Sequence, residues 1–146
     1  MKSLQDQLLS AIARENIFEI STLITSGALV NELDSQGWTP LAHAIEFENY
    51  QIVKLLLENG ADVNSILYNG DTCLHYAVDI AIDGTIQTGG ASGDEPTAII
   101  ELLLKNSANI LAKNVQGESP MDWAKNYHSD KIVRLLQGKL EERSET

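Results

Sequence analysis

The segment DSQGWTPLAHAIEFENYQIVKLLLENGADVN, residues 34–64, contains motifs that recur along the chain. Its GWTPL motif at 37–41 returns in altered form as GDTCL at 70–74 and as GESPM at 117–121. The first two copies are 33 residues apart and the last two are 47 apart, so one insertion of fourteen residues accounts for the difference. The runs IVKLLL at 52–57 and IIELLL at 99–104 are also 47 apart, which places the insertion between Leu74 and Ile99. Such self-similarity indicates a repeat architecture.

Each unit contains signals for two short helices. Thr39 can cap a helix and Pro40 suits its first turn, so we expect a first helix over residues 40–46. A second helix is expected over 50–58, where a nearly continuous apolar run suits burial between neighbours, and Gly60 supplies the left-handed residue that ends it. Because neither helix can bury its apolar face alone, the units must stack, and about three are needed for stability.

The 33-residue period, the Thr-Pro-Leu motif and the segment NGADVN at 59–64 resemble the ankyrin repeat family. The resemblance covers about residues 4–140 and implies an all-α solenoid of stacked helix-turn-helix units with short β-turn or hairpin tips. We expect a single domain over 1–140 with four repeats, at 1–33, 34–66, 67–113 and 114–140. The third repeat contains the insertion, expected to be a long loop over 80–95, and residues 141–146 are expected to form a frayed polar tail.

Two departures from the family pattern concern the third repeat. Ser107 stands where the pattern has the glycine that ends the second helix, and Cys73 stands where it has proline. The resemblance implies that His75 is a structural histidine that bonds the turn around Thr72. Cys73 and His75 are two residues apart on one expected helix and do not face each other, so a cysteine-dependent enzyme is only a remote alternative.

No other pattern predicts catalysis, a metal site or a cofactor. His43 and His128 belong to different repeats and have no ligand-like spacing around them. The glycine-rich run at 89–95 lacks the Lys-Ser/Thr ending and the preceding strand of a phosphate-binding loop, which favours a linker. We therefore expect a protein that is not an enzyme and that binds no metal or cofactor.

Composition limits the class of partner. The 146 residues are 43% hydrophobic and 21% charged, which is typical of one globular domain. Twenty-one acidic against ten basic residues give a net charge of −11, which would repel nucleic acid and anionic membrane surfaces. The charge would attract a basic protein, or it could serve solubility alone. With no long apolar run and no signal segment, we expect a cytoplasmic protein that is monomeric when free.

The resemblance also implies that a partner binds at the turn tips and on the exposed side of the first helices. Aromatic side chains beside carboxylates suit an interaction hot spot for a basic partner. Trp38 is the strongest single candidate, although it could instead pack against the adjacent turn, and Trp123 is expected to pack. The predicted partner-binding residues are Ser35, Gln36, Trp38, Glu46, Phe47, Tyr68, Asn69, Asp71, Asp79, Asp83, Asp94, Glu95, Gln116, Glu118 and Tyr127.

Two functions for such a binding module stay open. The leading hypothesis is a free-standing inhibitor that blocks a basic protein through an acidic concave face, similar to bacterial immunity proteins that neutralise a cognate toxin. The alternative is a scaffold, adaptor or effector that recognises a specific host or regulatory protein, with the insertion as the selective element. The insertion could also be a tolerated disordered excursion, since long surface insertions cost little free energy.

Overall fold

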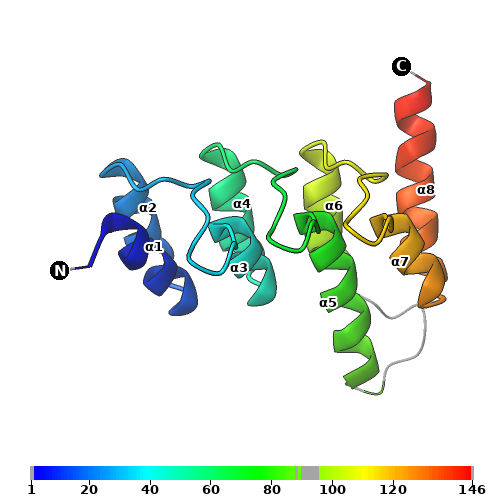
Figure 1. Cartoon of the computed structure of the whole chain (residues 1–146), viewed down its shortest axis with the longest axis horizontal. Helices are drawn as coiled ribbons and strands as arrows, with labels where there is room; N and C mark the ends of the chain where they lie inside the picture. Colours follow the sequence, from blue (N-terminus) through cyan, green and yellow to red (C-terminus); the bar gives the residue numbers. More distant parts are fainter. Residues whose placement is uncertain (1, 88, 90–95, 146) are drawn as a thin grey trace.

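The computed structural model describes residues 2–87, 89 and 96–145, and these residues form four helix pairs that stand side by side along the long axis (Figure 1). The helices are α1 (Leu4–Ala13), α2 (Ile17–Thr25), α3 (Pro40–Glu46), α4 (Tyr50–Glu58), α5 (Cys73–Gln87), α6 (Ala98–Lys105), α7 (Pro120–Asn126) and α8 (Asp130–Ser144). Within the described residues, β pairing is limited to one bridge between Ile66 and Thr72. The predicted all-α repeat solenoid is confirmed. Over the same residues, no helix is both long and apolar enough to cross a membrane.

The observed bounds of α3 and α4 are those expected from local signals. Thr39 Oγ1 accepts a hydrogen bond of 3.1 Å from the Ala42 N–H, and Pro40 begins the helix. The side chain of Asn49 accepts a bond of 3.1 Å from the Ile52 N–H at the start of α4. Gly60 follows the end of α4 with a φ of 91°. These caps satisfy backbone groups that the first turns of α3 and α4 would otherwise leave without a partner.

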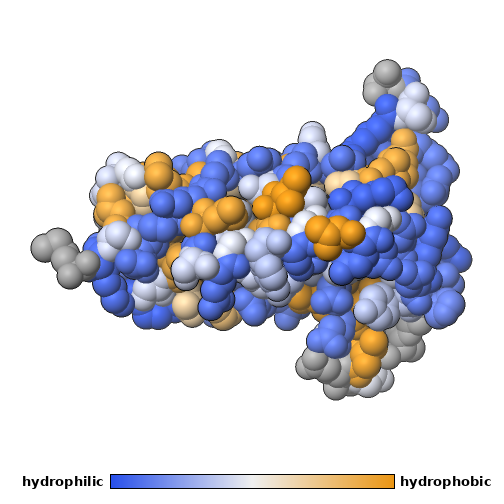
Figure 2. Space-filling model, viewed as in Figure 1, coloured by the Kyte–Doolittle hydropathy of each residue, from blue (hydrophilic) through white to orange (hydrophobic). Residues whose placement is uncertain are grey.

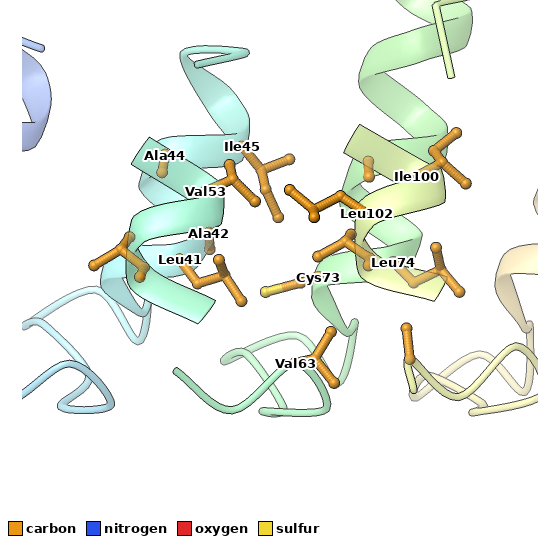
Figure 3. Packing of buried hydrophobic residues seen from close by; sticks show 14 of the residues in the cluster. Leu41, Ala42, Ala44, Ile45, Val53, Val63, Cys73, Leu74, Ile100 and Leu102 are labelled. Atoms are coloured by element: carbon orange, nitrogen blue, oxygen red, sulfur yellow. The ribbon is translucent and has the colours of Figure 1, made fainter. Parts of the chain in front are cut away.

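Apolar side chains fill the seams between neighbouring helix pairs. Figure 3 shows Ile45 of α3 and Leu102 of α6 pointing toward each other across the seam between the second and third pairs. Cys73 of α5 points toward Leu41 in the same seam. All four side chains are buried. Since burial of a large aliphatic side chain contributes roughly 1.5–3 kcal/mol, the seams are the main source of stability.

The turn tips between repeats also pack on one another. Each tip is closed by a backbone hydrogen bond, from Asp34 N–H to Trp38 O, from Leu67 N–H to Asp71 O, and from Asn114 N–H to Glu118 O, at 2.8, 2.9 and 2.9 Å. A Cβ atom on Gly70 would lie 2.8 Å from Val115 Cγ1 and 2.9 Å from Val115 N. The tips of the third and fourth repeats therefore approach so closely that glycine is required between them.

Two asparagine side chains link consecutive repeats through hydrogen bonds to the backbone of the next repeat. Asn31 accepts a hydrogen bond of 2.7 Å from the Asp62 N–H and donates one of 3.0 Å to the Gly60 carbonyl. Asn64 repeats this arrangement one unit later, with the Asn109 N–H at 2.8 Å and the Ser107 carbonyl at 3.2 Å. Each asparagine side chain thus satisfies backbone groups of the next repeat, which fixes the spacing of the array.

The insertion differs from the loop that we expected. Helix α5 continues to Gln87, so residues 80–87 extend the helix rather than forming part of a loop. The cause is a buried stripe with helical spacing that runs on from Val78 through Ala81 and Ile82 to Thr85. In Figure 1, α5 reaches well beyond the ends of α3 and α7. The rest of the expected loop, including Asp94 and Glu95, lies outside the described residues.

The expected frayed tail is also corrected. Helix α8 continues to Ser144, and its last turn is fixed by Arg143. The Arg143 guanidinium donates to the Ala108 carbonyl at 2.8 Å and to the Leu104 carbonyl at 3.1 Å. These carbonyls belong to the end of α6 and the segment after it, so a cation here also complements the helix dipole.

Ser107 provides a test of the repeat register. Its φ of 69° is in the left-handed region, where a side chain is unfavourable. Ser107→Gly should raise the free energy of unfolding by about 1 kcal/mol, measured by urea denaturation. The equivalent residue of the second repeat provides the reverse change, and Gly60→Ser should lower stability by a similar amount. If both variants change the free energy of unfolding in the same direction, Ser107 and Gly60 do not occupy equivalent positions in their repeats.

Gly70 tests the packing of the tips. Gly70→Ala should lower the free energy of unfolding by about 2–4 kcal/mol, because it adds a steric clash with Val115 to the strain of a left-handed backbone. Gly117→Ala is the matched control, since Gly117 has a similar φ of 79° but no atom within 4 Å of the added Cβ. If both variants lose the same stability in urea denaturation, the tips do not pack as described.

Candidate protein-binding surface

Asp34 organises the turn tip of the second repeat. Its Oδ1 accepts backbone hydrogen bonds from Gln36 at 2.8 Å and from Trp38 at 3.0 Å, and its Oδ2 lies 2.7 Å from Nε2 of His43. Burial raises the pKa of Asp34, but the hydrogen bonds from His43, Trp38 and Gln36 outweigh it and hold the pKa below its ordinary value. The charged form of Asp34 is therefore the one that the tip stabilises.

The Trp38 ring joins the second repeat to the third. Its centroid lies 4.7 Å from that of Tyr76 at an interplanar angle of 86°, and 5.5 Å from that of His43. Edge-to-face contact of this kind is favourable beyond simple burial. Trp38 is partly buried and packs against the core and the Tyr76 ring of α5. Its contact with a partner stays a prediction.

A recess lies between the end of α3 and the extended part of α5, and we call it the acidic recess. Its volume is about 300 Å³. The residues that line it are Glu46, Glu48, Tyr76, Asp79, Ile80, Asp83 and Gly84. Four of these seven are carboxylic acids, and none of the described lining residues is basic. The extended helix supplies one wall, since Asp83 and Gly84 lie beyond the point where a regular first helix would end.

The acidic recess has a strongly negative electrostatic environment. Burial raises the pKa of Asp79, and the nearby charges of Asp83 and Asp71 raise it further. Burial, together with the charges of Glu46 and Asp79, raises the pKa of Tyr76 to about 12. The part of each shift that comes from neighbouring negative charges shows that the carboxylates repel one another here, and the same charges would attract a cation placed in the recess. Within the described residues, however, no three potential ligands cluster closely enough to hold a metal ion.

His75 and Cys73 do not form a nucleophile and base pair. His75 Nδ1 accepts the Thr72 N–H at 3.0 Å, and Nε2 lies 2.8 Å from the Glu118 carbonyl, to which it donates. Both ring nitrogens are therefore engaged with backbone groups, as expected for a structural histidine. Cys73 is buried, and burial raises its pKa to about 12, so the thiol stays neutral near pH 7.

A family model described as ankyrin repeats in three copies matches residues 8–82, more than half of the chain, and a second model, described as ankyrin repeat, matches residues 69–115. The chain belongs to the ankyrin repeat family. Ankyrin repeats generally act as non-catalytic modules that bind other proteins, so this chain contains a protein–protein interaction module.

The ankyrin array brings only some of the predicted partner-binding residues together. Glu46, Asp79 and Asp83 meet in the acidic recess. The other predicted residues with exposed side chains are Ser35, Gln36, Tyr68 and Gln116 at the turn tips, and Phe47 and Tyr127 at the ends of α3 and α7. Glu118 is half-buried, and its Oε2 accepts a hydrogen bond of 2.9 Å from Trp123 Nε1. Trp123 also packs edge-on against His75, with centroids 5.2 Å apart, as expected for a packing residue.

The prediction that Asp71 occupies an exposed slot is wrong. The residue is only 5% exposed. Its Oδ2 accepts a hydrogen bond of 2.6 Å from Asn69 Nδ2, and its Oδ1 accepts one of 2.8 Å from Asn114 Nδ2. Asp71 therefore ties the tip of the third ankyrin repeat to that of the fourth, and Asn69 is engaged in the same bridge.

Sequence reasoning missed Tyr76 and Glu48 as parts of the site. Tyr76 lies 33 residues after His43, so the repeat register places both on the inner face of their first helices. Glu48 lies in the connection between α3 and α4, where a φ of 52° turns the chain back. The register could have identified Tyr76, whereas the position of Glu48 depends on how the neighbouring ankyrin repeat packs beside it.

The depressed pKa of Asp34 predicts a pH-dependent contribution to stability. This contribution is present above the ordinary carboxyl pKa and is lost as the pH falls through the lowered value. Asp34→Asn should therefore be less stable than the natural chain at pH 7, by about 1 kcal/mol, and the difference should shrink below roughly pH 4. Urea denaturation across pH measures it, with the exposed Glu141→Gln as control. A difference that does not change with pH would contradict the stabilising role of the Asp34 carboxylate.

Proposed function

We propose that this ankyrin module is a non-catalytic inhibitor that binds a basic protein and blocks its functional surface, in the manner of bacterial immunity proteins that neutralise a cognate toxin. The observation that carries the proposal is the acidic recess, which four carboxylic acids line together with Tyr76 in a chain of net charge −11. A lysine or arginine side chain of the partner would enter this recess and offset the repulsion among its carboxylates, which adds to burial in raising the pKa values of Asp79 and Tyr76. A partner that carries phosphate groups would be repelled by the same carboxylates.

The negative charge of the protein favours binding of a basic partner both at long range and at short range. The net negative charge attracts a basic protein over long distances and raises the encounter rate by something like 10–10³ at low salt. At short range, a cation paired inside a recess dissociates more slowly than one at an open surface.

Exposed apolar side chains provide further contact area beside the charged groups. Tyr68 is 69% exposed at its tip, and Val115 is 74% exposed at the next one. Figure 2 shows apolar patches spaced along the face that carries the connecting segments, separated by polar surface. Aromatic and apolar anchors next to charged groups are common in protein–protein hot spots.

The recess carboxylates give a direct test. Glu46→Gln combined with Asp79→Asn should weaken binding of the partner by at least about tenfold and reduce its salt dependence, because two charges close to the bound cation are removed. Glu141→Gln combined with Glu145→Gln is the matched control, since it removes the same charge from the exposed end of α8. A partner captured by the natural chain supplies the ligand, and surface plasmon resonance at several salt concentrations measures both effects.

The activity of that partner then separates the inhibitor from an adaptor. An inhibitor must abolish the activity of its partner at a one-to-one ratio, and the recess variant must restore it. If the partner is acidic or neutral, or if the two pairs of substitutions weaken binding equally, the recess is not the binding site. If binding is tight but the activity of the partner is unchanged, the protein is an adaptor and the inhibitor proposal is wrong.

A further inference from the structure

A second hollow lies beside the acidic recess, and we call it the apolar pocket. Its volume is about 140 Å³. It is lined mainly by aliphatic side chains, among them Ile45, Ile80, Ile99 and Ile100, and by alanines of α5 and α6. Glu48 is the one acid among the described lining residues, and none of them is basic. The pocket is comparable in size to an engineered apolar cavity of about 150 Å³ that binds benzene, so one aliphatic side chain fits it.

The insertion creates this pocket. In the second repeat, three residues, 47–49, connect α3 to α4, whereas in the third repeat α5 continues to Gln87 and α6 begins only at Ala98. The extended helix brings Ile80 and Ala81 beside the α3–α4 connection, and Pro96 and Ala98 border the opening from the start of α6. The small side chains of the lining alanines leave the space that forms the pocket.

The apolar pocket and the acidic recess are neighbours. Glu48 and Ile80 line both hollows, so these two side chains form a shared wall. On one side of this wall the lining is aliphatic, and on the other it contains Glu46, Asp79 and Asp83. A ligand that fills both must therefore carry an apolar group and a positive charge close together.

We propose that the two hollows form one composite site for a surface segment of a basic protein, with a leucine-sized side chain in the apolar pocket and an arginine or lysine side chain in the acidic recess. The two side chains lie next to each other, as at positions i and i+2 of an extended segment, which point to the same side. This inference rests on the proposed function, because it takes the basic partner from it. It adds that the partner must carry a leucine-sized apolar residue close to an arginine or lysine in its sequence.

Charge complementarity favours this occupant over the others. A second copy of this chain has a net charge of −11 and would be repelled from the recess. A purely apolar ligand would bring no positive charge to the carboxylates that line the recess. A cation alone would leave the apolar pocket empty. The apolar pocket therefore supplies selectivity among basic partners, which charge alone does not provide.

Blocked peptides test the composite site directly on the full chain. The probe is acetyl-Gly-Leu-Ser-Arg-Gly-amide, and its controls replace leucine by glycine or arginine by glutamine. Methyl NMR signals of Ile45, Ile80 and Ile99 report on the pocket, and the ring signals of Tyr76 report on the recess. The leucine peptide should shift both sets of signals and bind at least about tenfold more tightly than either control, because each control empties one hollow.

A variant that fills the pocket completes the experiment. Ala98→Met places a larger side chain at the exposed edge of the pocket and should make the leucine and glycine peptides bind equally. Both peptides should still bind through their arginine in the acidic recess. Gln51→Met is the matched control, since Gln51 is the exposed equivalent of Ala98 in the second repeat and does not line the pocket. It should leave the preference for leucine intact.

Each other outcome has a defined meaning. If the natural chain binds the arginine peptides but gains nothing from leucine, the composite site is wrong while the proposed function stands. If replacing arginine by glutamine has no effect, both fail. If the pocket methyl signals shift on dilution without peptide, a second copy of the chain occupies the pocket, and the proposal is overturned. The peptide controls use the natural chain, so these conclusions hold even if Ala98→Met does not fold.

Discussion

The stacking of each helix pair on its neighbour is the interaction on which the rest of this structure depends. Helices of seven residues, such as α3 and α7, are far shorter than the roughly 12–15 residues that an isolated helix needs in water. They persist because neighbouring helices cover their apolar side, as where Ile45 of α3 faces Leu102 of the next pair. Stability is therefore a sum of contacts between neighbours, and every surface feature is carried by a unit that its neighbours hold in place.

Hydrogen bonds between polar groups of consecutive repeats fix the spacing of the stack. His75 reaches the Glu118 carbonyl, Asp71 reaches Asn114, and Asn64 reaches the backbone around Ser107, so each bridge joins two consecutive repeats. Because these groups are hydrogen-bonded across the boundary between repeats, a shift of one repeat against the next would break several hydrogen bonds at once. The tips and the recess are thereby held in position before a partner arrives, which lowers the entropy cost of binding.

Local sequence signals were sufficient for the elements that local interactions fix. Thr39, Pro40 and Gly60 gave the bounds of the second repeat because caps act within a few residues. The helical continuation through Ala81 and Ile82 was not predicted, because the fourteen-residue insertion was expected to form a long loop over 80–95 between two helices. Asp71 could not be placed, because its partner Asn114 is 43 residues away and the pairing exists only in the stack. Glu46, Asp79 and Asp83 were predicted as partner-binding residues without the recess that brings them together, and Glu48 was not predicted because its place in the recess depends on how neighbouring repeats pack.

The insertion shows why an irregular repeat is useful in such an array. Since each repeat contacts only its neighbours, the cost of lengthening α5 is confined to the third repeat and the seams beside it. Its effect on the surface is larger, because Asp79 is the equivalent of Glu46 and the helix would otherwise end there. The continuation supplies Asp83 to the recess and Ala81 to the apolar pocket, and it turns an open face into two hollows. A charge bound in a hollow is partly shielded from water, so the same carboxylates attract a cation more strongly than they would on a flat surface.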